Sequence, residues 1–187
     1  MVSYNKIIGL PLLILNEGKK SGIVHEIVFE INRNIVAGFI IIEIGKKRKF
    51  VEMSDIKLLE DKIIIQDYMS MKNWDKSRSK DKRFVCGKEL IMKKVFDYIG
   101  NEVGYICDIF MDFQIGSVEA FHLTDGIVED LIEGRKIIPV LGKTVLKEEG
   151  LFVGKESVEE FVDVKKGIKQ IFSIHEEVIT KNLQRSD

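Results

Sequence analysis

The chain has 187 residues, of which 45% are hydrophobic and 32% are charged, and its formal net charge at pH 7 is −1. This composition excludes an intrinsically disordered protein. The segment Met1 to Leu15 is apolar but interrupted by polar residues and a proline, so it is too short and too broken for a signal peptide or a membrane span. We therefore expect a cytoplasmic protein.

The opening of the chain predicts a β-hairpin. Lys6 to Leu15 is apolar, but Pro11 has no N–H for a strand ladder, which predicts an edge strand or a strand entry. Ser21 to Ile31 alternates imperfectly between apolar and polar residues, and Asn32 to Asn34 has the composition of a turn. Ile35 to Ile44 is rich in β-branched residues, which favour a pleated strand over a helix, so we expect it to be the central strand.

Shorter strands are expected after this hairpin. Lys49 to Met53 and Ile63 to Ile65 are short apolar segments separated by turn residues. Five or six short strands at spacings of about ten residues predict a small antiparallel barrel, closed or nearly closed. Closure would also remove free sheet edges.

The segment Gly22 to Phe39 recurs without a gap at Gly104 to Phe121, a constant 82 residues later. After Thr124 the offset rises to 87, and the inserted residues lie within Gly126 to Gly134. One small domain is therefore present twice. We expect equivalent core residues in the two copies, namely Ile27, Val36, Phe39 and Ile41 in the first and Ile109, Val118, Phe121 and Leu123 in the second.

The repeat divides the chain into four parts. Residues 1–72 and 84–156 are the two expected barrel-like domains, and residues 73–83 are a charged linker. Residues 72–83 carry six basic and two acidic side chains, whereas residues 84–165 carry nine basic and sixteen acidic ones. This unequal distribution argues against a nucleic-acid-binding face that runs along the whole chain.

Residues 157–187 predict a C-terminal helix and tail. Ser157 and Glu160 fit a capping box, and apolar residues then follow at steps of three and four as far as Val178. The helix is expected to end near Leu183. Its apolar stripe needs a cover, and we expect it to pack on its own chain, which favours a monomer over a dimer.

The repeated segment resembles the PRC-barrel family, the domain of the photosynthetic reaction-centre H subunit and of the C-terminal half of the ribosome maturation factor. The shared pattern is an apolar strand, a Gly-Lys turn, a Gly-hydrophobic-x-acidic-hydrophobic stretch and a buried apolar strand. In this chain these are Gly18-Lys19, Gly22 to Ile27 and Val36 to Ile42, and then Gly100-Asn101, Gly104 to Ile109 and Val118 to Leu123.

The resemblance covers roughly residues 4–70 and 84–155, as two tandem copies. The closing element of the family pattern appears as Ile137-Ile138-Pro139 in the second copy, whereas Phe50-Val51-Glu52 in the first lacks the proline. The resemblance implies six-stranded barrels that act as binding or docking modules, without an enzymatic activity common to the family. It also implies a looser link to RNA metabolism.

The cysteines, histidines and acidic residues are not spaced as in a catalytic or metal-binding motif. Cys86 and Cys107 match no metal or redox spacing, and no histidine has a second ligand at the spacing of a zinc site. Asp108, Asp112 and His122 form the only polar cluster that could suggest an enzyme, and they alternate with apolar strand residues. We therefore predict no enzyme, no cofactor and no metal.

Two binding functions remain. The favoured one is an adaptor that docks a protein partner through one barrel or through the groove between two. The alternative is a ribosome- or RNA-associated factor that binds through a basic hairpin and the linker. The candidate partner-binding residues are Lys46, Lys47, Arg48 and Lys49 in the hairpin, and Lys80, Lys82 and Arg83 in the linker.

Overall fold

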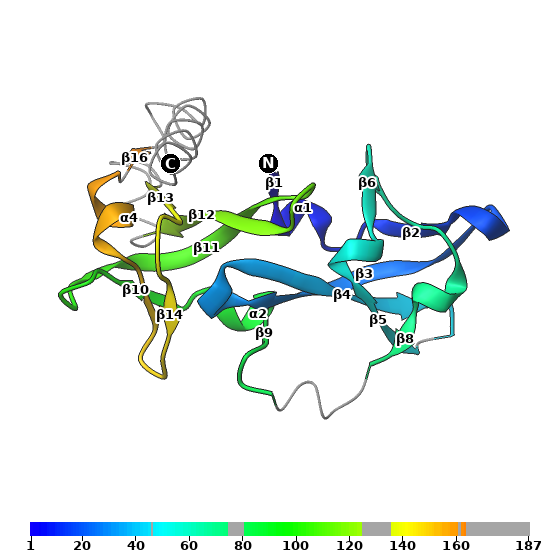
Figure 1. Ribbon diagram of the computed structural model, residues 1–187, viewed down its shortest axis with the longest axis horizontal. Coiled ribbons are helices and arrows are strands. Elements are labelled where there is room, and N and C mark those ends of the chain that lie inside the picture. The colour runs from blue at the N-terminus through cyan, green and yellow to red at the C-terminus, as the bar shows by residue number, and fades with distance from the viewer. Residues whose placement is uncertain (46, 75–80, 125–135, 161, 164–187) are drawn as a thin grey trace, which may run out of the picture.

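The computed structural model describes residues 1–45, 47–74, 81–124, 136–160 and 162–163, and this part of the chain is mainly β, as the sequence predicts (Figure 1). In the first half, single helical turns and short strands flank a long hairpin. Its elements are β1 (Val2–Ser3), α1 (Tyr4–Ile7), β2 (Pro11–Ile14), η1 (Leu15–Glu17), β3 (Lys19–Glu30), η2 (Ile31–Arg33), β4 (Ile35–Glu43), β5 (Arg48–Glu52), η3 (Met53–Asp55), β6 (Lys57–Leu59), β7 (Lys62–Ile65), η4 (Tyr68–Ser70) and β8 (Lys72–Asn73).

The second half repeats this order. A single helical turn again follows the first short strand, and a long hairpin again leads to shorter closing strands. Its elements are β9 (Val85–Cys86), α2 (Gly87–Leu90), β10 (Lys94–Phe96), β11 (Glu102–Asp112), β12 (Ser117–Thr124), β13 (Lys136–Pro139), β14 (Val145–Leu146), β15 (Leu151–Phe152), α4 (Lys155–Glu159) and β16 (Val162–Asp163).

The repeat in the sequence is also a repeat of strand register. In each half, the central strand of the hairpin lies between the opening strand and the strand that follows. Phe39 pairs with Ile27 on one side and with Val51 on the other, and Phe121 pairs with Ile109 and with Ile138. The predicted alignment of the two copies, including the larger offset beyond Thr124, is therefore confirmed.

The described strands form one open sheet instead of two closed barrels. The hydrogen-bonded path runs from β14 through the two long hairpins to β6 and does not close. Closure fails because other segments take the edges that would close each half: β8 pairs with the free edge of β5, and β16 pairs with that of β13. The sheet is mixed, since β2 and β7 run parallel, as do β10 and β15.

The two halves meet about a pseudo-twofold axis. At its centre, Ile35 of β4 pairs with the equivalent residue Ser117 of β12. The Val36 N–H donates to the Gly116 carbonyl, and the Val118 N–H donates to the Asn34 carbonyl, each at 2.7 Å. These are the same hydrogen bond made in both directions, as in the interface of a symmetric dimer.

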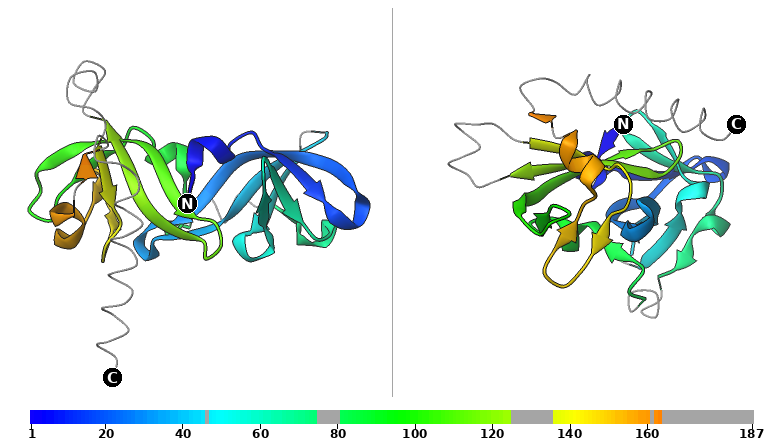
Figure 2. Two further views of the ribbon diagram at one scale, coloured as in Figure 1. Left: turned by 90° about the horizontal axis from the view of Figure 1, so that it is seen from above. Right: turned by 60° about the vertical axis from the view of Figure 1, so that its left-hand side comes forward.

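Each half also receives its neighbour's first strand. Strand β1 of the first half pairs with β11, where Val2 lies opposite Met111. Strand β9 of the second half pairs with β3, where Val85 lies opposite Phe29. Figure 2 shows β1 at the centre of the molecule, where the two long hairpins approach each other. The halves therefore exchange strands reciprocally.

The core is shared by the two halves. One cluster of buried apolar residues includes side chains from both hairpins, and Phe113 from the second half packs edge-on against Phe39 of the first, with ring centroids 5.8 Å apart. The predicted core residues are confirmed as buried: Ile27, Val36, Phe39, Ile41, Ile109, Val118, Phe121 and Leu123.

The N-terminal strand expected over Lys6 to Leu15 is only partly correct. Tyr4–Ile7 is a helical turn, and the strand begins at Pro11. The turn forms because Tyr4 and Ile7 are buried, while the Asp108 carboxylate accepts a hydrogen bond from the Asn5 N–H at 3.1 Å. Pro11 occupies the first position of its strand, where a missing N–H costs least.

The capping box predicted at Ser157 is wrong. The helical turn α4 begins after Gly154 and ends at Glu159, and Val162–Asp163 pairs as a strand with β13. Ser157 is buried, and its hydroxyl both donates to the carbonyl of Leu141 and accepts from its N–H at 2.9 Å. That tertiary contact replaces the cap. The predicted helix from residue 164 onward lies outside the described residues.

We expect the two halves to stay together when the chain is cut between them. Cleavage at a protease site inserted between Trp74 and Asp81 would break the chain between the halves. The shared core and the exchanged strands β1 and β9 would still hold the two fragments together. After cleavage under native conditions, the fragments should elute as one species in size-exclusion chromatography. Separation into two folded monomers would contradict the strand exchange.

Candidate partner-binding surfaces

Buried polar groups line the contact between the halves. The Tyr4 hydroxyl donates to the Glu26 carboxylate at 2.9 Å, and the Ser3 hydroxyl hydrogen-bonds Asp108 of the other half. Burial, and next the hydrogen bond to Glu26, hold the pKa of Tyr4 well above its usual value. These carboxylates are therefore occupied in joining elements of the structure.

Strand register brings together two of the three residues of the polar cluster, because Asp108 of β11 lies opposite His122 of β12, and all three side chains also have other contacts. Asp108 binds Ser3 and Asn5, and Asp112 accepts hydrogen bonds from the N–H groups of the turn that follows it, including Gln114 at 2.7 Å. His122 stacks on Phe110. Each side chain thus has a separate structural contact. Among the described residues, no cluster of His, Cys, Asp and Glu could hold a metal ion, and no helix is long and apolar enough to cross a membrane.

An open groove lies between the halves on one side of the pseudo-twofold axis. We call it the inter-half groove; its volume is about 740 Å³. One wall is η3 and β6 of the first half, and the other is the turn after β11 of the second. The lining residues are Met1, Met53, Ser54, Ile56, Lys57, Leu58, Asp112, Phe113 and Gln114.

The equivalent position on the other side of the axis is bridged by side-chain hydrogen bonds between the halves. There the Asn32 side chain accepts a hydrogen bond from the Leu146 N–H at 3.1 Å, and the Asn34 side chain donates to the Gly142 carbonyl at 3.0 Å. The repeat offset makes Gln114 the counterpart of Asn32 and Gly116 the counterpart of Asn34. The two sides of one pseudosymmetric interface are therefore built differently.

The basic candidate residues fall into two groups. Lys46 and Lys80 lie outside the described residues. Lys47 and Arg48 are exposed, and Lys49 donates to the Asn73 side chain at 2.9 Å while its ammonium lies 5.3 Å from the centre of the Tyr68 ring. These three residues form the outer end of the first half.

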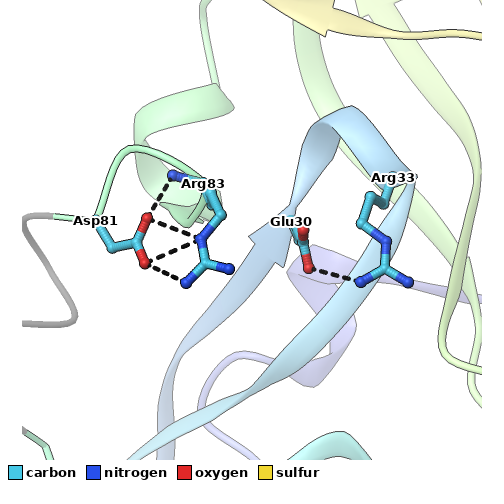
Figure 3. Close-up of polar contacts among 4 residues, drawn as sticks. All are labelled: Glu30, Arg33, Asp81 and Arg83. Atoms are coloured by element: carbon cyan, nitrogen blue, oxygen red, sulfur yellow. Dashed lines mark hydrogen bonds and ion pairs between the residues drawn. The ribbon is translucent and has the colours of Figure 1, made fainter.

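The second basic group lies at the junction of the halves. Lys82 is exposed, and the Arg83 guanidinium binds the Asp81 carboxylate through two nitrogens, at 3.0 and 2.6 Å. Figure 3 shows this pair beside the ion pair of Glu30 and Arg33 at the end of β3. The Asp81 carboxylate partly offsets the positive charge of the Arg83 guanidinium. Arg83 is therefore a weaker binding site for an anionic ligand than an unpaired arginine would be.

Strand register separates the two groups. Val85 lies opposite Phe29, whereas Lys49 pairs with Ile41, which lies opposite Val24. Five residues along a strand correspond to roughly 17 Å. The described basic residues of the hairpin and of the linker therefore do not form one continuous patch.

A second cavity, of about 570 Å³, opens at the outer end of the first half. The side chains of Ile44 and Tyr68 border it and are 79% and 40% exposed. Lys19 and Lys20 also line it, so apolar and basic groups occur together. Its lining residues are Glu17, Lys19, Lys20, Ser21, Glu43, Ile44 and Tyr68.

A groove between the two repeats was expected as a possible docking site, but the lining residues of neither cavity were predicted from the sequence. The walls of the inter-half groove come from η3 and from the turn after β11, which are far apart in the chain and carry no shared motif. Tyr68 follows a short strand in a segment with no periodic pattern. Only the repeat offset could have indicated that residues 113–116 face the first half as residues 31–34 face the second.

Comparison with known families agrees with the first repeat. The PRC-barrel domain family matches residues 1–70. No curated protein gives a significant match to the chain. The matched residues include the first long hairpin and the strands β5 to β7, so the similarity lies in the first half of the molecule.

We expect Cys86 to react slowly with alkylating agents. Burial, followed by the nearby carboxylates of Glu26 and Glu89, raises the pKa of Cys86 to about 11. At pH 8 only about one thiol in a thousand would be ionised, and the thiolate is the reactive form. Iodoacetamide labelling of a Cys107→Ser variant should therefore accelerate about tenfold per pH unit between pH 8 and 10. Labelling at the rate of the urea-unfolded chain would contradict this environment.

Proposed function

We propose that this chain is a non-enzymatic docking protein, built from two PRC-barrel-like repeats, that binds a protein partner in the inter-half groove. One observation carries the proposal: the groove is open, whereas at its pseudosymmetric counterpart the side-chain amides of Asn32 and Asn34 make hydrogen bonds to the other half. Two copies of one interface could be stabilised by the same hydrogen bonds on both sides, so we take the open side to be functional.

The groove has the composition of a protein-binding site. Met53 and Phe113, both half-buried, provide apolar surface, and Lys57 and Asp112 provide one charge of each sign at its margins. Phe113 is held in place by its edge-on contact with Phe39, so this wall is rigid before a partner arrives. A preformed apolar surface with a polar rim lowers the entropic cost of association. We further propose that the second half is also a PRC-barrel-like repeat and that the protein acts in the cytoplasm.

The proposal can be tested by site-specific photocrosslinking in cells. A photoreactive phenylalanine analogue at Gln114, an exposed residue of the groove, should form a discrete protein adduct. The same analogue at Tyr98, which is 53% exposed at the outer end of the second half, is the matched control and should form none. Ser54→Trp, which fills the groove from an exposed position, should abolish the Gln114 adduct.

Equal crosslinking from Gln114 and Tyr98 would contradict docking in the groove. An adduct at Gln114 that survives Ser54→Trp would also count against it. Nuclease treatment before irradiation separates a directly bound protein, whose adduct persists, from one that is recruited through RNA.

A second candidate function is RNA binding at the outer end of the first half. The supporting observation is that Lys47 and Arg48 are exposed and directly precede Lys49, whose ammonium lies 5.3 Å from the centre of the exposed Tyr68 ring, so cations and an aromatic face occur together. Two acidic partners reduce the net charge, since Glu17 pairs with Lys19 at 2.8 Å and Glu52 pairs with Lys72 at 2.6 Å. This reduction ranks RNA below a protein partner.

For this second function, we expect a double variant with Lys47→Ser and Arg48→Ser to lose RNA affinity and to lower the salt dependence. Each phosphate contact contributes about −0.7 to the slope of log K against log salt for single strands, so the slope should become less steep by roughly 1.4 units. Fluorescence anisotropy with a labelled single-stranded RNA measures both quantities. Binding that is unchanged in the variant, or undetectable in the parent protein at physiological salt, would exclude this site.

A further inference from the structure

The edge of β6 presents backbone groups to the inter-half groove. Strands β6 and β7 form a hairpin with Leu59 opposite Lys62 and Leu58 opposite Ile63. In an antiparallel hairpin with a two-residue loop, the pair next to the loop is hydrogen-bonded and the following pair is not. The N–H and C=O of Leu58 therefore point away from β7, on the free edge of the strand.

The second half confirms this geometry and shows how the edge is satisfied there. Its hairpin is closed by a hydrogen bond from the Lys147 N–H to the Gly150 carbonyl at 2.9 Å. The next residue outward, Leu146, lies opposite Leu151, and its N–H points away from β15 and donates to the Asn32 side chain. A carbonyl group delivered by the other half thus covers this edge.

Leu58 is the counterpart of Leu146, but its surroundings differ. Leu58 and Gln114, the counterpart of Asn32, both line the inter-half groove. Strand β6 is the last strand of the sheet path, and among the described residues no turn or loop hydrogen bond involves the Leu58 N–H. An uncovered strand edge is a template for pairing with another chain.

We infer that an extended segment of a protein partner adds to the free edge of β6. This inference rests on the proposed docking function and specifies how the partner binds. A carbonyl of the segment accepts from the Leu58 N–H in the way that the Asn32 carbonyl does from Leu146, and the next N–H of the segment donates to the Leu58 carbonyl. A helix would not fit this edge, because its own backbone groups are already hydrogen-bonded within the helix.

The groove also indicates which side chains the segment carries. Successive side chains of a strand point to opposite faces, so one residue faces the apolar surface of Met53 and Phe113 while its neighbours face solvent. A β-branched or aliphatic residue suits the wall. An acidic residue suits the position beside exposed Lys57, and a basic one the position beside Asp112.

The test uses the full chain and linear twelve-residue peptides selected on it from a phage-displayed library. The key variant is Leu58→Pro, which removes the outward N–H without removing a bond to β7, and the matched control is Leu58→Ala, which keeps the N–H. We expect Leu58→Pro to weaken peptide binding at least tenfold, Leu58→Ala to weaken it less than threefold, and Ser54→Trp to abolish it. Calorimetry measures affinity, and urea denaturation checks that each variant folds.

Two measurements on the unaltered protein keep the inference testable if Leu58→Pro does not fold. Hydrogen exchange of the Leu58 amide should slow at least tenfold when peptide is bound. Replacing one peptide amide by an ester, at the residue that donates to the Leu58 carbonyl, should weaken binding about tenfold.

The outcomes separate this inference from the docking function. Peptides that bind in the groove, as shown by their loss in Ser54→Trp, without protecting the Leu58 amide would overturn strand addition and leave groove docking intact. If no selected peptide is sensitive to Ser54→Trp, strand addition is overturned, and a Gln114 photocrosslink to a protein would then decide groove docking independently.

Discussion

The molecule depends on the reciprocal backbone hydrogen bonds that join β4 to β12. Val36 and Val118 each donate to the turn of the other hairpin at 2.7 Å, which fixes the turns of the two hairpins against each other at the pseudo-twofold axis. The exchanged strands β1 and β9 reinforce the same contact. Two repeats of this size would each have a small core, and merging them into one cluster reduces the surface that each must protect from water.

Local signals predicted the hairpins well. Asn34 adopts the left-handed conformation expected of a turn asparagine, with φ of 56°. At Gly22 no side chain fits, because a Cβ would lie 2.4 Å from the Ile42 carbonyl oxygen, and its counterpart Gly104 has a positive φ of 137° that favours glycine. The open sheet could not be predicted in this way. Closure depends on which segment takes the free edge of β5, and that segment, β8, is two residues long and carries no strand pattern of its own.

The candidate surfaces also differ in how far local sequence predicts them. Exposure of Lys47 and Arg48 follows from their charge and was predictable. A groove between the repeats was also expected, but its lining residues could not be predicted, because they depend on how two turns distant in the chain face each other across the pseudo-twofold axis. The Ser157 error has a similar origin. A serine three residues before a glutamate satisfies the capping pattern locally, but two hydrogen bonds to the Leu141 backbone determine its actual position.

One pair of equivalent residues contributes directly to the difference between the two sides of the axis. Asn34 and Gly116 both occupy the left-handed region, at φ of 56° and 70°, so the backbone requirement is the same in both turns. Asparagine at this position also supplies an amide, which donates to the Gly142 carbonyl and links the two halves on that side. Glycine supplies none, and Met53 lies 3.0 Å from where its Cβ would be, so a side chain there would have to displace Met53. The same backbone conformation therefore supplies a hydrogen bond between the halves on one side of the axis and none on the other, because the residue that adopts it carries an amide in one repeat and no side chain in the other.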